Sequence, residues 1–506
     1  MKSVKSTLTG RYFAVLCAAL ALYSLSCASG ALWQDSGLIQ YRIWHNDLKG
    51  FFGLALSHPL FYIVAIAVKT LPFGEFAHRI NMVSAVAGAA AIANLYLLVR
   101  LLAGRDIPAV IAAITLAVSH TFWRHASIIE TYTLWTALFL AELIVLLHYV
   151  RTKRIRFLYW LGLLNGLAIA VHILASISLV CYAVFIAYLL IKKEIHLKNL
   201  GMIVLLWIAG ALPYVYLIAG TMIQTGDVTG TLASAAFGTR WQGAVLNASL
   251  SLSLVKENLC YILFNFPSPN ILLLFAGGFA LFKTPPDRGF GNILLALMAL
   301  FFVFAFRYIV PDRYAFFIPF YVIASILIGL GAQFLLDRMH HQALVFVVLL
   351  FSVLPIGVYA AAPTMAGWMQ LDVGTRDDIP YRNDNAYFLQ PWKTGYKGAE
   401  RFADEVLDAV GEDAVIYADV TTVGPLLLAQ QVRHKRPDVT IISGTVNSRH
   451  APPFNEQTIG TLLEDRPLYV VSRKPGYCPA FVLEHYDLVR AGIVWKVTPR
   501  KRTAGL

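Results

Sequence analysis

A single acid, Asp35, lies just beyond the first long apolar run of the chain, in the sequence LWQDSG at positions 32–37. A carboxylate at such a boundary could act as a general base, taking a proton from an acceptor hydroxyl while that oxygen attacks an activated carbon. It could equally be an interfacial acid that hydrates the end of a membrane span. Its position alone leaves both interpretations open.

A second group of ionisable residues lies at positions 119–135, in the sequence SHTFWRHASIIETYTLW, where two apolar runs meet. Its ionisable members are His120, Arg124, His125 and Glu130. So many ionisable groups at a membrane corner are costly unless they are paired or solvated. The stretch indicates either a substrate-binding turn or a solvated turn in which Glu130 benefits from the dipole of the next helix.

A third group lies at positions 307–314, in the sequence RYIVPDRY. Its polar members are Arg307, Tyr308, Asp312, Arg313 and Tyr314. Arginine suits a phosphate and tyrosine is frequent at membrane interfaces, so this turn could bind a lipid phosphate headgroup. Snorkelling anchors with an Arg–Asp ion pair would explain it as well. His58 with Arg79, and Arg240 with Trp241, are weaker candidates.

The composition is that of a multi-pass membrane protein. Of the 506 residues, 58% are hydrophobic and 14% are charged, whereas about 25% charged residues are usual in soluble domains. The formal net charge is +12, but Lys and Arg gather in the predicted cytoplasmic loops, so nucleic-acid binding is not indicated. The five cysteines include no CxxC pair and no zinc-ligand spacing, so neither a disulfide framework nor a metal finger is predicted.

Apolar runs long enough to cross a bilayer predict about eleven membrane helices. They lie near residues 11–31, 80–103, 108–124, 129–150, 157–172, 174–192, 199–221, 268–283, 290–307, 314–336 and 342–362. The first run could also be a cleaved signal peptide, although its length favours a span. The run at 58–74 has Pro near both ends and an internal Lys, so we expect a juxtamembrane helix there.

Placing the N-terminus in the cytoplasm gives every predicted inner loop basic residues, as the positive-inside rule requires. These loops are 103–106, 151–156, 192–198, 283–289 and 337–341. The three polar groups then lie outside, and the chain is expected in the cell (inner) membrane. We expect a transmembrane domain at 1–362, with a first outer loop at 32–79, and an extracytoplasmic α/β domain at 363–506, because helical and strand patterns alternate there.

Four segments resemble the protein O-mannosyltransferase-like branch of the GT-C membrane glycosyltransferase superfamily. They are WQDSG at 33–37, the stretch 54–100, the stretch 119–140 and the tail segment 400–439. The resemblance implies a GT-C-like α-helical polytopic fold with a small C-terminal α/β domain. It also implies transfer of a sugar from a polyprenyl-phosphate carrier to an outer hydroxyl of a protein, glycan or lipid, with no separate cofactor.

The same resemblance assigns roles to residues. Asp35 takes the position of the base, His58 begins the His-Pro motif, and Glu130 with Tyr132 forms the Glu-x-Tyr motif. The remaining candidates for substrate binding are Arg79, His120, Arg124, His125, Arg307, Arg313 and Tyr314. The chain departs from the family at Leu38, where a second acid is frequent, and at Leu60 and Phe61, which follow the His-Pro pair. The carrier phosphate would leave against Arg124, Arg307 or Arg313, without an obligatory metal.

Two other functions remain open. A transporter or lipid flippase would place ionisable groups near the middle of the bilayer, and Glu142 and His148 lie inside a predicted span. A scaffold would use the tail to bind another envelope protein. The pattern of the outer charges favours the glycosyltransferase. Sequence motifs of nucleotide binding are absent, so an activated donor is expected to arrive from the bilayer.

Overall fold

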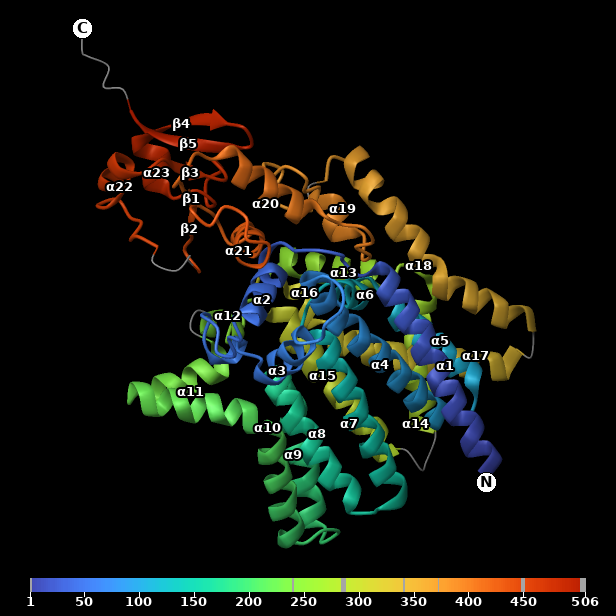
Figure 1. Ribbon diagram of the computed structural model, residues 1–506. Coiled ribbons are helices and arrows are strands. Elements are labelled where there is room, and N and C mark those ends of the chain that lie inside the picture. Colours follow the sequence, from blue (N-terminus) through green and yellow to red (C-terminus); the bar gives the residue numbers. More distant parts are fainter. Residues whose placement is uncertain are drawn as a thin grey trace.

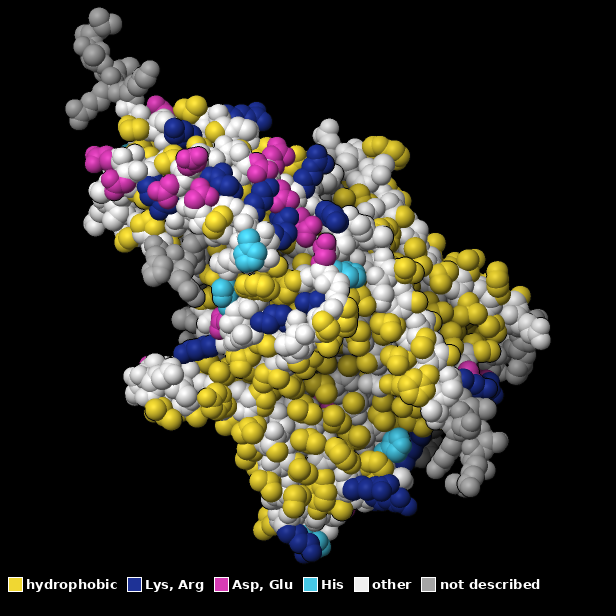
Figure 2. Space-filling view, in the orientation of Figure 1, with side chains coloured by type: hydrophobic (Ala, Val, Ile, Leu, Met, Phe, Trp, Pro, Cys, Tyr) yellow, Lys and Arg dark blue, Asp and Glu magenta, His cyan; other side chains and the backbone are white. Residues whose placement is uncertain are grey.

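The computed structural model describes residues 2–238, 241–283, 288–339, 342–371, 373–446 and 451–500. Arg240 and parts of the predicted inner loops 283–289 and 337–341 lie outside the described residues. The chain forms a large helical body with a small sheet domain at one end (Figure 1). Hydrophobic side chains cover most of the helical body, whereas Lys, Arg, Asp and Glu gather over the sheet domain (Figure 2). This distribution is that of a multi-pass membrane protein.

Seven helices in the described ranges are long and apolar enough to cross a membrane. They are α1 (Lys2–Ser26, of which Leu8–Ser26 is apolar), α4 (Phe76–Ala103), α7 (Tyr132–Thr152), α10 (Leu197–Thr225), α15 (Arg288–Arg307), α17 (Ile318–Met339) and α18 (Gln342–Trp368). Two bent pairs raise this number to nine if each pair is one span. The expected count of about eleven is therefore not confirmed.

The two bent pairs break at the sites of polar turns. Helices α5 (Asp106–Ala117) and α6 (His120–Ser127) meet at 66°, and α13 (Leu252–Asn265) meets the helical stretch Pro269–Leu281 at 112°. That stretch consists of η2 (Pro269–Leu272) and the first part of α14 (Leu273–Lys283). Helices α8 (Arg156–Val171) and α9 (Ala175–Ile191) are apolar but have only 16 and 17 residues. Each is about 25 Å long, short of a hydrocarbon core of about 30 Å.

The first outer loop folds over the end of the bundle. It contains α2 (Gln34–Trp44), η1 (Leu54–Leu56) and α3 (Pro59–Lys69). Helix α3 has 11 residues and is therefore about 17 Å long, too short to cross the bilayer. Pro59 is the first residue of α3, where its missing N–H costs no hydrogen bond. The other short helices are α11 (Val228–Phe237), α12 (Gln242–Val245), α16 (Arg313–Phe316) and α19 (Asp384–Leu389).

The C-terminal part contains a five-stranded sheet in the order β2-β1-β3-β5-β4. The strands β1 (Val415–Tyr417), β2 (Thr440–Ile442) and β3 (Leu468–Val470) are parallel, and β4 (Tyr486–Ala491) and β5 (Val494–Pro499) form an antiparallel pair. The helices are α20 (Gly398–Ala409), α21 (Val423–Val432), α22 (Ile459–Asp465) and α23 (Ala480–His485). The predicted small α/β fold is confirmed. Helix α18 continues to Trp368, past residue 362, where the transmembrane domain was expected to end.

Glu142 has a structural explanation inside the bundle. It is buried on α7 and accepts hydrogen bonds from Asn165 on α8 at 3.3 Å and from Ser178 on α9 at 3.5 Å. Trp207 on α10 donates to the same asparagine at 3.1 Å. His148 bonds to the carbonyl of Ile144 on its own helix. The contacts of Glu142, Asn165, Ser178 and Trp207 are of the interhelical polar kind that holds membrane helices together.

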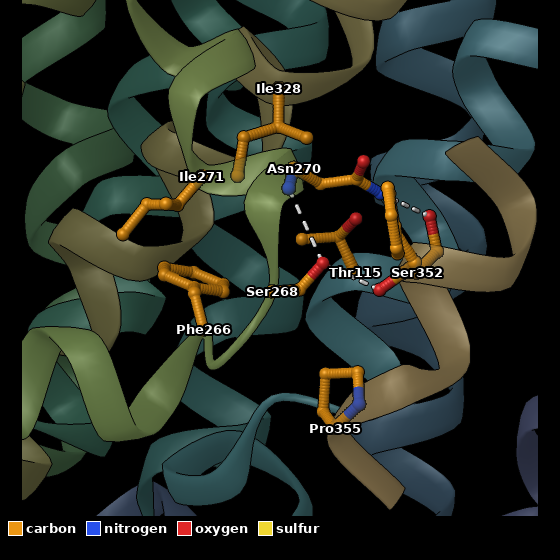
Figure 3. A pocket seen from close by; sticks show the side chains of 9 residues that line it. Thr115, Phe266, Ser268, Asn270, Ile271, Ile328, Ser352 and Pro355 are labelled. Carbon is orange, nitrogen blue, oxygen red and sulfur yellow. Dashed lines mark hydrogen bonds between the residues drawn. The ribbon is translucent and has the colours of Figure 1, made fainter. Parts of the chain in front are cut away.

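The break after α13 is stabilised by polar side chains that bond to α18. Pro355 has no N–H, so the helix leaves the carbonyl of Phe351 without its usual donor. Ser268 Oγ donates to this carbonyl at 2.6 Å, and Asn270 Nδ2 donates to the carbonyl of Val348 at 2.8 Å. A pocket lies among these groups, and the side chains of Asn270 and Ser352 point toward each other across it (Figure 3).

We predict that Ser268→Ala destabilises the protein by about 1 kcal/mol, because it leaves the Phe351 carbonyl without a donor. Thermal unfolding of the purified protein in detergent measures this effect. Thr70→Ala is the matched control, since the Thr70 hydroxyl is exposed and bonds only within its own turn. Equal melting temperatures of the two variants would show that the bond to α18 contributes nothing.

Candidate active site

Asp35 is held at the start of α2 by contacts on both sides. It is the second residue of the helix, where the helix dipole favours an acid. The preceding residue, Gln34, adopts a left-handed φ of 56° and donates its backbone N–H to the carbonyl of Thr421 at 3.1 Å. The side chain of Asp35 is exposed, whereas the four residues that follow it are buried. The carboxylate is therefore accessible at the edge of a tightly packed helix.

The glycine of the DSG sequence permits this packing. A Cβ atom on Gly37 would lie 2.3 Å from the carbonyl oxygen of Leu32. A Cβ atom on Gly424, in the first turn of α21, would lie 2.7 Å from the backbone carbon of Gly37. Real Cβ atoms do not approach so closely, so α2 and α21 touch through two glycines. The C-terminal part thus fixes the position of the helix that carries Asp35.

Glu130 lies next to Asp35 because the neighbouring serine bonds to it. Ser36 Oγ donates to Glu130 Oε1 at 2.9 Å. On α4, Ser84 Oγ accepts the backbone N–H of Glu130 at 2.9 Å and donates to its carbonyl at 3.0 Å. The two candidate catalytic acids are therefore brought together, although 95 positions separate them in the sequence.

Arg124 is the buried cation of this region. Its side chain is 5% exposed, and Nη1 donates to the hydroxyl of Tyr314 at 2.6 Å. The guanidinium faces the rings of Tyr387 and Phe388 at 5.5 and 5.2 Å. Across the described ranges, no ion pair joins it to a carboxylate, and its Nε has no hydrogen-bond partner. A buried arginine with a spare donor is suited to an anionic ligand.

The other candidate arginines are engaged elsewhere. Arg313 forms an ion pair with Glu257 at 2.5 Å, so the alternative of an Arg–Asp pair within RYIVPDRY is wrong for this residue. Arg307 donates to the carbonyls of Asn247 and Val245 at 2.5 and 3.2 Å. Arg79 donates to the backbone carbonyls of residues 69, 73 and 74. Arg307 and Arg79 therefore satisfy loop carbonyls.

The candidate histidines line the same region. His58 donates through Nδ1 to the carbonyl of Val171, and its ring lies 4.7 Å from that of His172. The ring of Tyr132 lies 5.2 Å from His172 and 5.0 Å from His125, which in turn lies 6.0 Å from Tyr314. An unbroken series of rings thus runs from the His-Pro motif to the RY motif. His120 bonds through Nε2 to the carbonyl of Phe388 at 2.8 Å.

The acids at this site oppose one another's ionisation. Desolvation, and then the Asp35 carboxylate, raise the pKa of Glu130 to about 8. The same two causes raise the pKa of Asp312 to about 7. Desolvation by the surrounding protein also raises the pKa of Asp35, although its side chain is exposed. Three neighbouring carboxyl groups with raised pKa values do not all ionise at neutral pH.

Sequence reasoning missed several residues of this region. Lys393 is 2% exposed, donates to the carbonyl of Gln390 at 2.5 Å, and has a pKa lowered by burial and by Arg124. It follows α19, whose Tyr387 packs on Arg124. His172, whose ring lies between those of His58 and Tyr132, belonged to none of the predicted groups. The aromatic and basic residues of 381–396 are visible in the sequence, but no local pattern shows that this segment folds back onto α6.

Comparisons with known proteins fit this geometry. Residues 56–197 match the family model of the Protein O-mannosyl-transferase TMEM260 N-terminal domain. The Protein O-mannosyl-transferase TMEM260 of Mus musculus is 29% identical over 167 residues, which are 32% of this chain and 24% of the mouse protein. This chain therefore matches about a quarter of the length of that relative. The matched segment contains the His-Pro and Glu-x-Tyr motifs but begins after Asp35.

A solved structure shares the architecture of this chain. The crystal structure of ArnT from Cupriavidus metallidurans bound to undecaprenyl phosphate aligns with a TM-score of 0.60 at 14% identity, over 98% of this chain and 99% of that chain. An oligosaccharyltransferase from Archaeoglobus fulgidus aligns with a TM-score of 0.48 at 16% identity, over 91% and 69%.

The fold is similar to that of ArnT over nearly the whole of both chains. Residues 56–197 are similar to the N-terminal domain of the TMEM260 protein O-mannosyl-transferases. The resemblance to the protein O-mannosyltransferase-like branch, which the sequence indicated, is confirmed. The roles of individual site residues stay predictions.

We predict that Gly424→Ala destabilises the protein by about 1–3 kcal/mol, because the added methyl group collides with the backbone of α2. The matched control is Gly444→Ala, where a Cβ atom would meet nothing within 4 Å. Thermal unfolding of both variants provides the measurement. If Gly424→Ala melts like Gly444→Ala, the close approach of α2 and α21 does not hold Asp35 in place.

Proposed function

We propose that this chain is a membrane glycosyltransferase that moves a sugar from a polyprenyl-phosphate carrier to a hydroxyl acceptor. The observation that carries the proposal is one pair of features. The first feature is the accessible carboxylate of Asp35, which interacts electrostatically with Glu130 and Asp312. The second is Arg124, which interacts electrostatically with the same two acids, is buried, and forms no ion pair with a carboxylate in the described residues. A base and a cation that can hold the leaving phosphate are the two parts that such a transfer needs.

The reaction is a direct displacement at the anomeric carbon of the sugar. The acceptor O–H bond breaks and its proton goes to the Asp35 carboxylate, while the acceptor oxygen forms a bond to the anomeric carbon. The bond between this carbon and the phosphate oxygen breaks, and its electron pair stays on the phosphate. The products are the glycosylated acceptor and the carrier monophosphate.

Arg124 is the best candidate for the leaving phosphate. Of the three arginines that the sequence suggested, Arg307 already donates to loop carbonyls and Arg313 is paired with Glu257. Lys393 interacts electrostatically with Arg124 from the C-terminal segment, but burial and Arg124 lower the pKa of Lys393, which favours its neutral form. A phosphate monoester carries its charge well, so Arg124 is sufficient without an obligatory metal. The crystal structure of ArnT with undecaprenyl phosphate supports a donor of this chemical class.

The proposed orientation places the N-terminus in the cytoplasm and the site with the C-terminal domain on the outer face of the cell (inner) membrane. Its support is the charge distribution, because the tip of the helical body opposite the sheet domain carries Lys and Arg (Figure 2). The acceptor is a hydroxyl of a protein, a glycan or a lipid. Glu142 had favoured a transporter because it lies inside a span. Its hydrogen bonds with Asn165 and Ser178 on neighbouring helices give this acid a structural role instead.

We predict that Asp35→Asn lowers the rate of sugar transfer by about 100-fold or more, because the amide cannot take the acceptor proton. The assay gives the purified protein a panel of polyprenyl-phosphate sugars and follows release of the carrier monophosphate. Asp227→Asn is the matched control, since Asp227 caps an exposed helix and asparagine caps equally well.

Two results would contradict the proposal in different ways. Unchanged turnover of Asp35→Asn would remove this residue as the base. Lipid translocation by the wild-type protein in vesicles, with no transfer from any donor, would favour a flippase.

We predict that Arg124→Gln weakens binding of a polyprenyl monophosphate by about 10- to 100-fold, because a buried charge-assisted contact is lost. Titration of the lipid into detergent-solubilised protein, followed by intrinsic fluorescence, gives the dissociation constants. Arg307→Gln is the control, since its guanidinium is used by loop carbonyls and we expect little change. Equal affinities of the two variants would place the phosphate elsewhere.

A further inference from the structure

Gln34, the residue directly before Asp35, has a backbone conformation that needs support. Its φ of 56° lies in the left-handed region, which is costly for a residue with a side chain. Such a conformation persists only where the surrounding structure holds it. Two contacts from the C-terminal part do so. The backbone N–H of Gln34 donates to the carbonyl of Thr421 at 3.1 Å, and its side-chain Oε1 accepts a hydrogen bond from Arg382 Nη2 at 3.4 Å.

The loop that supplies the Thr421 carbonyl is organised by Asp419. This loop joins β1 to α21, and Asp419 lies two residues beyond the end of β1. Asp419 Oδ1 accepts the backbone N–H of Thr421 at 2.8 Å, as in an Asx turn, and Oδ2 accepts the hydroxyl of Thr422 at 3.3 Å. The Asp419 carboxylate therefore fixes the backbone of the residue whose carbonyl holds Gln34.

Arg376 holds the Asp419 carboxylate in place. The two side chains are 1% and 6% exposed, and Arg376 Nη1 donates to Asp419 Oδ1 at 2.5 Å. The guanidinium also pairs with Asp378 at 2.9 Å and lies over the ring of Tyr477 at 4.0 Å. Ser472, two residues beyond the end of β3, donates to Asp378. The arginine is thus linked to the ends of two parallel strands.

These contacts lie where doubly wound sheets bind their ligands. Strands β2 and β3 lie on opposite sides of β1, and in such sheets a ligand binds beyond the carboxyl ends of the strands at the point where the strand order reverses. Here Arg376, from the segment between α18 and α19, bonds to Asp419 after β1 and, through Asp378, to Ser472 after β3. The chain's own arginine takes the place of a ligand, and the loop beside it holds α2.

A second path of hydrogen bonds joins Arg376 to Gln34. Asp384 accepts the backbone N–H of Arg376 at 2.8 Å and Arg382 Nε at 2.6 Å. Arg382 in turn donates to Gln34. One path from Arg376 passes through Asp419 and its loop, and the other passes through Asp384. Both end at the residue before the candidate base, so they form a closed ring of hydrogen bonds.

We propose that Asp419 is a positioning residue for the transfer reaction, which sets the Asp35 carboxylate through Thr421 and Gln34. This inference rests on the proposed function, because it requires Asp35 to be the base. Asp419 keeps Gln34 in the conformation from which α2 begins. A base must lie about 3 Å from the hydroxyl oxygen that it deprotonates, and a displacement of about 1 Å can cost about 100-fold in rate.

The test compares Asp419→Ala with Asp419→Asn in the sugar-transfer assay. Alanine removes the acceptor of the Thr421 N–H, whereas the amide oxygen of asparagine keeps it. Asp378 remains as a partner of Arg376 in both variants. We expect kcat to fall about tenfold in Asp419→Ala and less than threefold in Asp419→Asn, because only alanine releases the loop that holds Gln34.

Two controls show whether the effect is specific. The dissociation constant of a polyprenyl monophosphate should change less than twofold in Asp419→Ala, because Arg124 is unaltered. Asp438→Ala is the matched control variant, since Asp438 also pairs with an arginine and accepts a backbone N–H, but before β2, at the amino ends of the strands. Its kcat should equal that of the wild-type protein.

The double variant Asp35→Asn/Asp419→Ala separates positioning from a loss of stability. A residue that acts through Asp35 has no further effect once the base is absent, so the double variant should turn over as slowly as Asp35→Asn alone. Losses that multiply would overturn the inference, as would an unchanged kcat in Asp419→Ala. Should Asp419→Ala fail to fold, Asp419→Ser takes its place, because a hydroxyl forms the same kind of turn more weakly.

Hydrogen exchange in the segment 32–38 gives a measurement that needs no activity. We expect the Gln34 amide to exchange faster in Asp419→Ala and at the wild-type rate in Asp438→Ala, because only the first change releases its acceptor. An unchanged exchange rate in Asp419→Ala would overturn the inference while leaving the proposed function intact. Absence of sugar transfer by the wild-type protein from any donor would contradict the proposed function, and the role of Asp419 with it.

Discussion

The burial of Arg124 without a carboxylate partner in the part of the chain that the structure describes is the constraint on which this site depends. A guanidinium is costly to remove from water unless its donors and its charge are satisfied. Here one hydroxyl, from Tyr314, and the faces of aromatic rings stabilise it. These groups come from α16 and α19, which lie about 190 and 260 positions later in the chain. The surroundings of this cation are therefore formed only by the folded chain, and they leave its Nε without a hydrogen-bond partner among the described residues.

Helix α2 joins the two halves of the molecule because its two sides have different partners. Leu38 and Trp33 pack into the core of the C-terminal part, whereas Ser36 bonds to Glu130 on the membrane side. The helical period separates the two sets of side chains within five residues. The position of Asp35 thus depends on the packing of the C-terminal part as much as on the membrane bundle. This dependence argues against a C-terminal part that is joined to the membrane bundle only by the connecting chain.

Patterns of neighbouring residues in the sequence predicted the helices and strands whose formation depends mainly on nearby residues. Apolar length predicted most of the spans, and alternating patterns predicted the parallel strands and their helices. The predicted run at 157–172 was already as short as α8, whereas the run at 174–192 extends beyond both ends of α9. The sequence also could not show which of Arg124 and Arg307 is available to a ligand, because both are arginines near the end of a span. Only the fold determines which of them donates to backbone carbonyls. Lys393 lay outside every candidate group, since its contacts with α6 are entirely long-range.

The exposure of the three acids indicates how one site could hold both a base and proton donors. Asp35 is exposed at the first turn of α2, where the helix dipole favours the carboxylate, although desolvation by the surrounding protein raises its pKa. Glu130 and Asp312 are half-buried and face that carboxylate, so their neutral forms are favoured. Neighbouring acids whose environments separate their pKa values take different roles in many enzymes. The most exposed acid would then accept the acceptor's proton, while the enclosed acids keep the net charge low enough for a phosphate to enter beside Arg124.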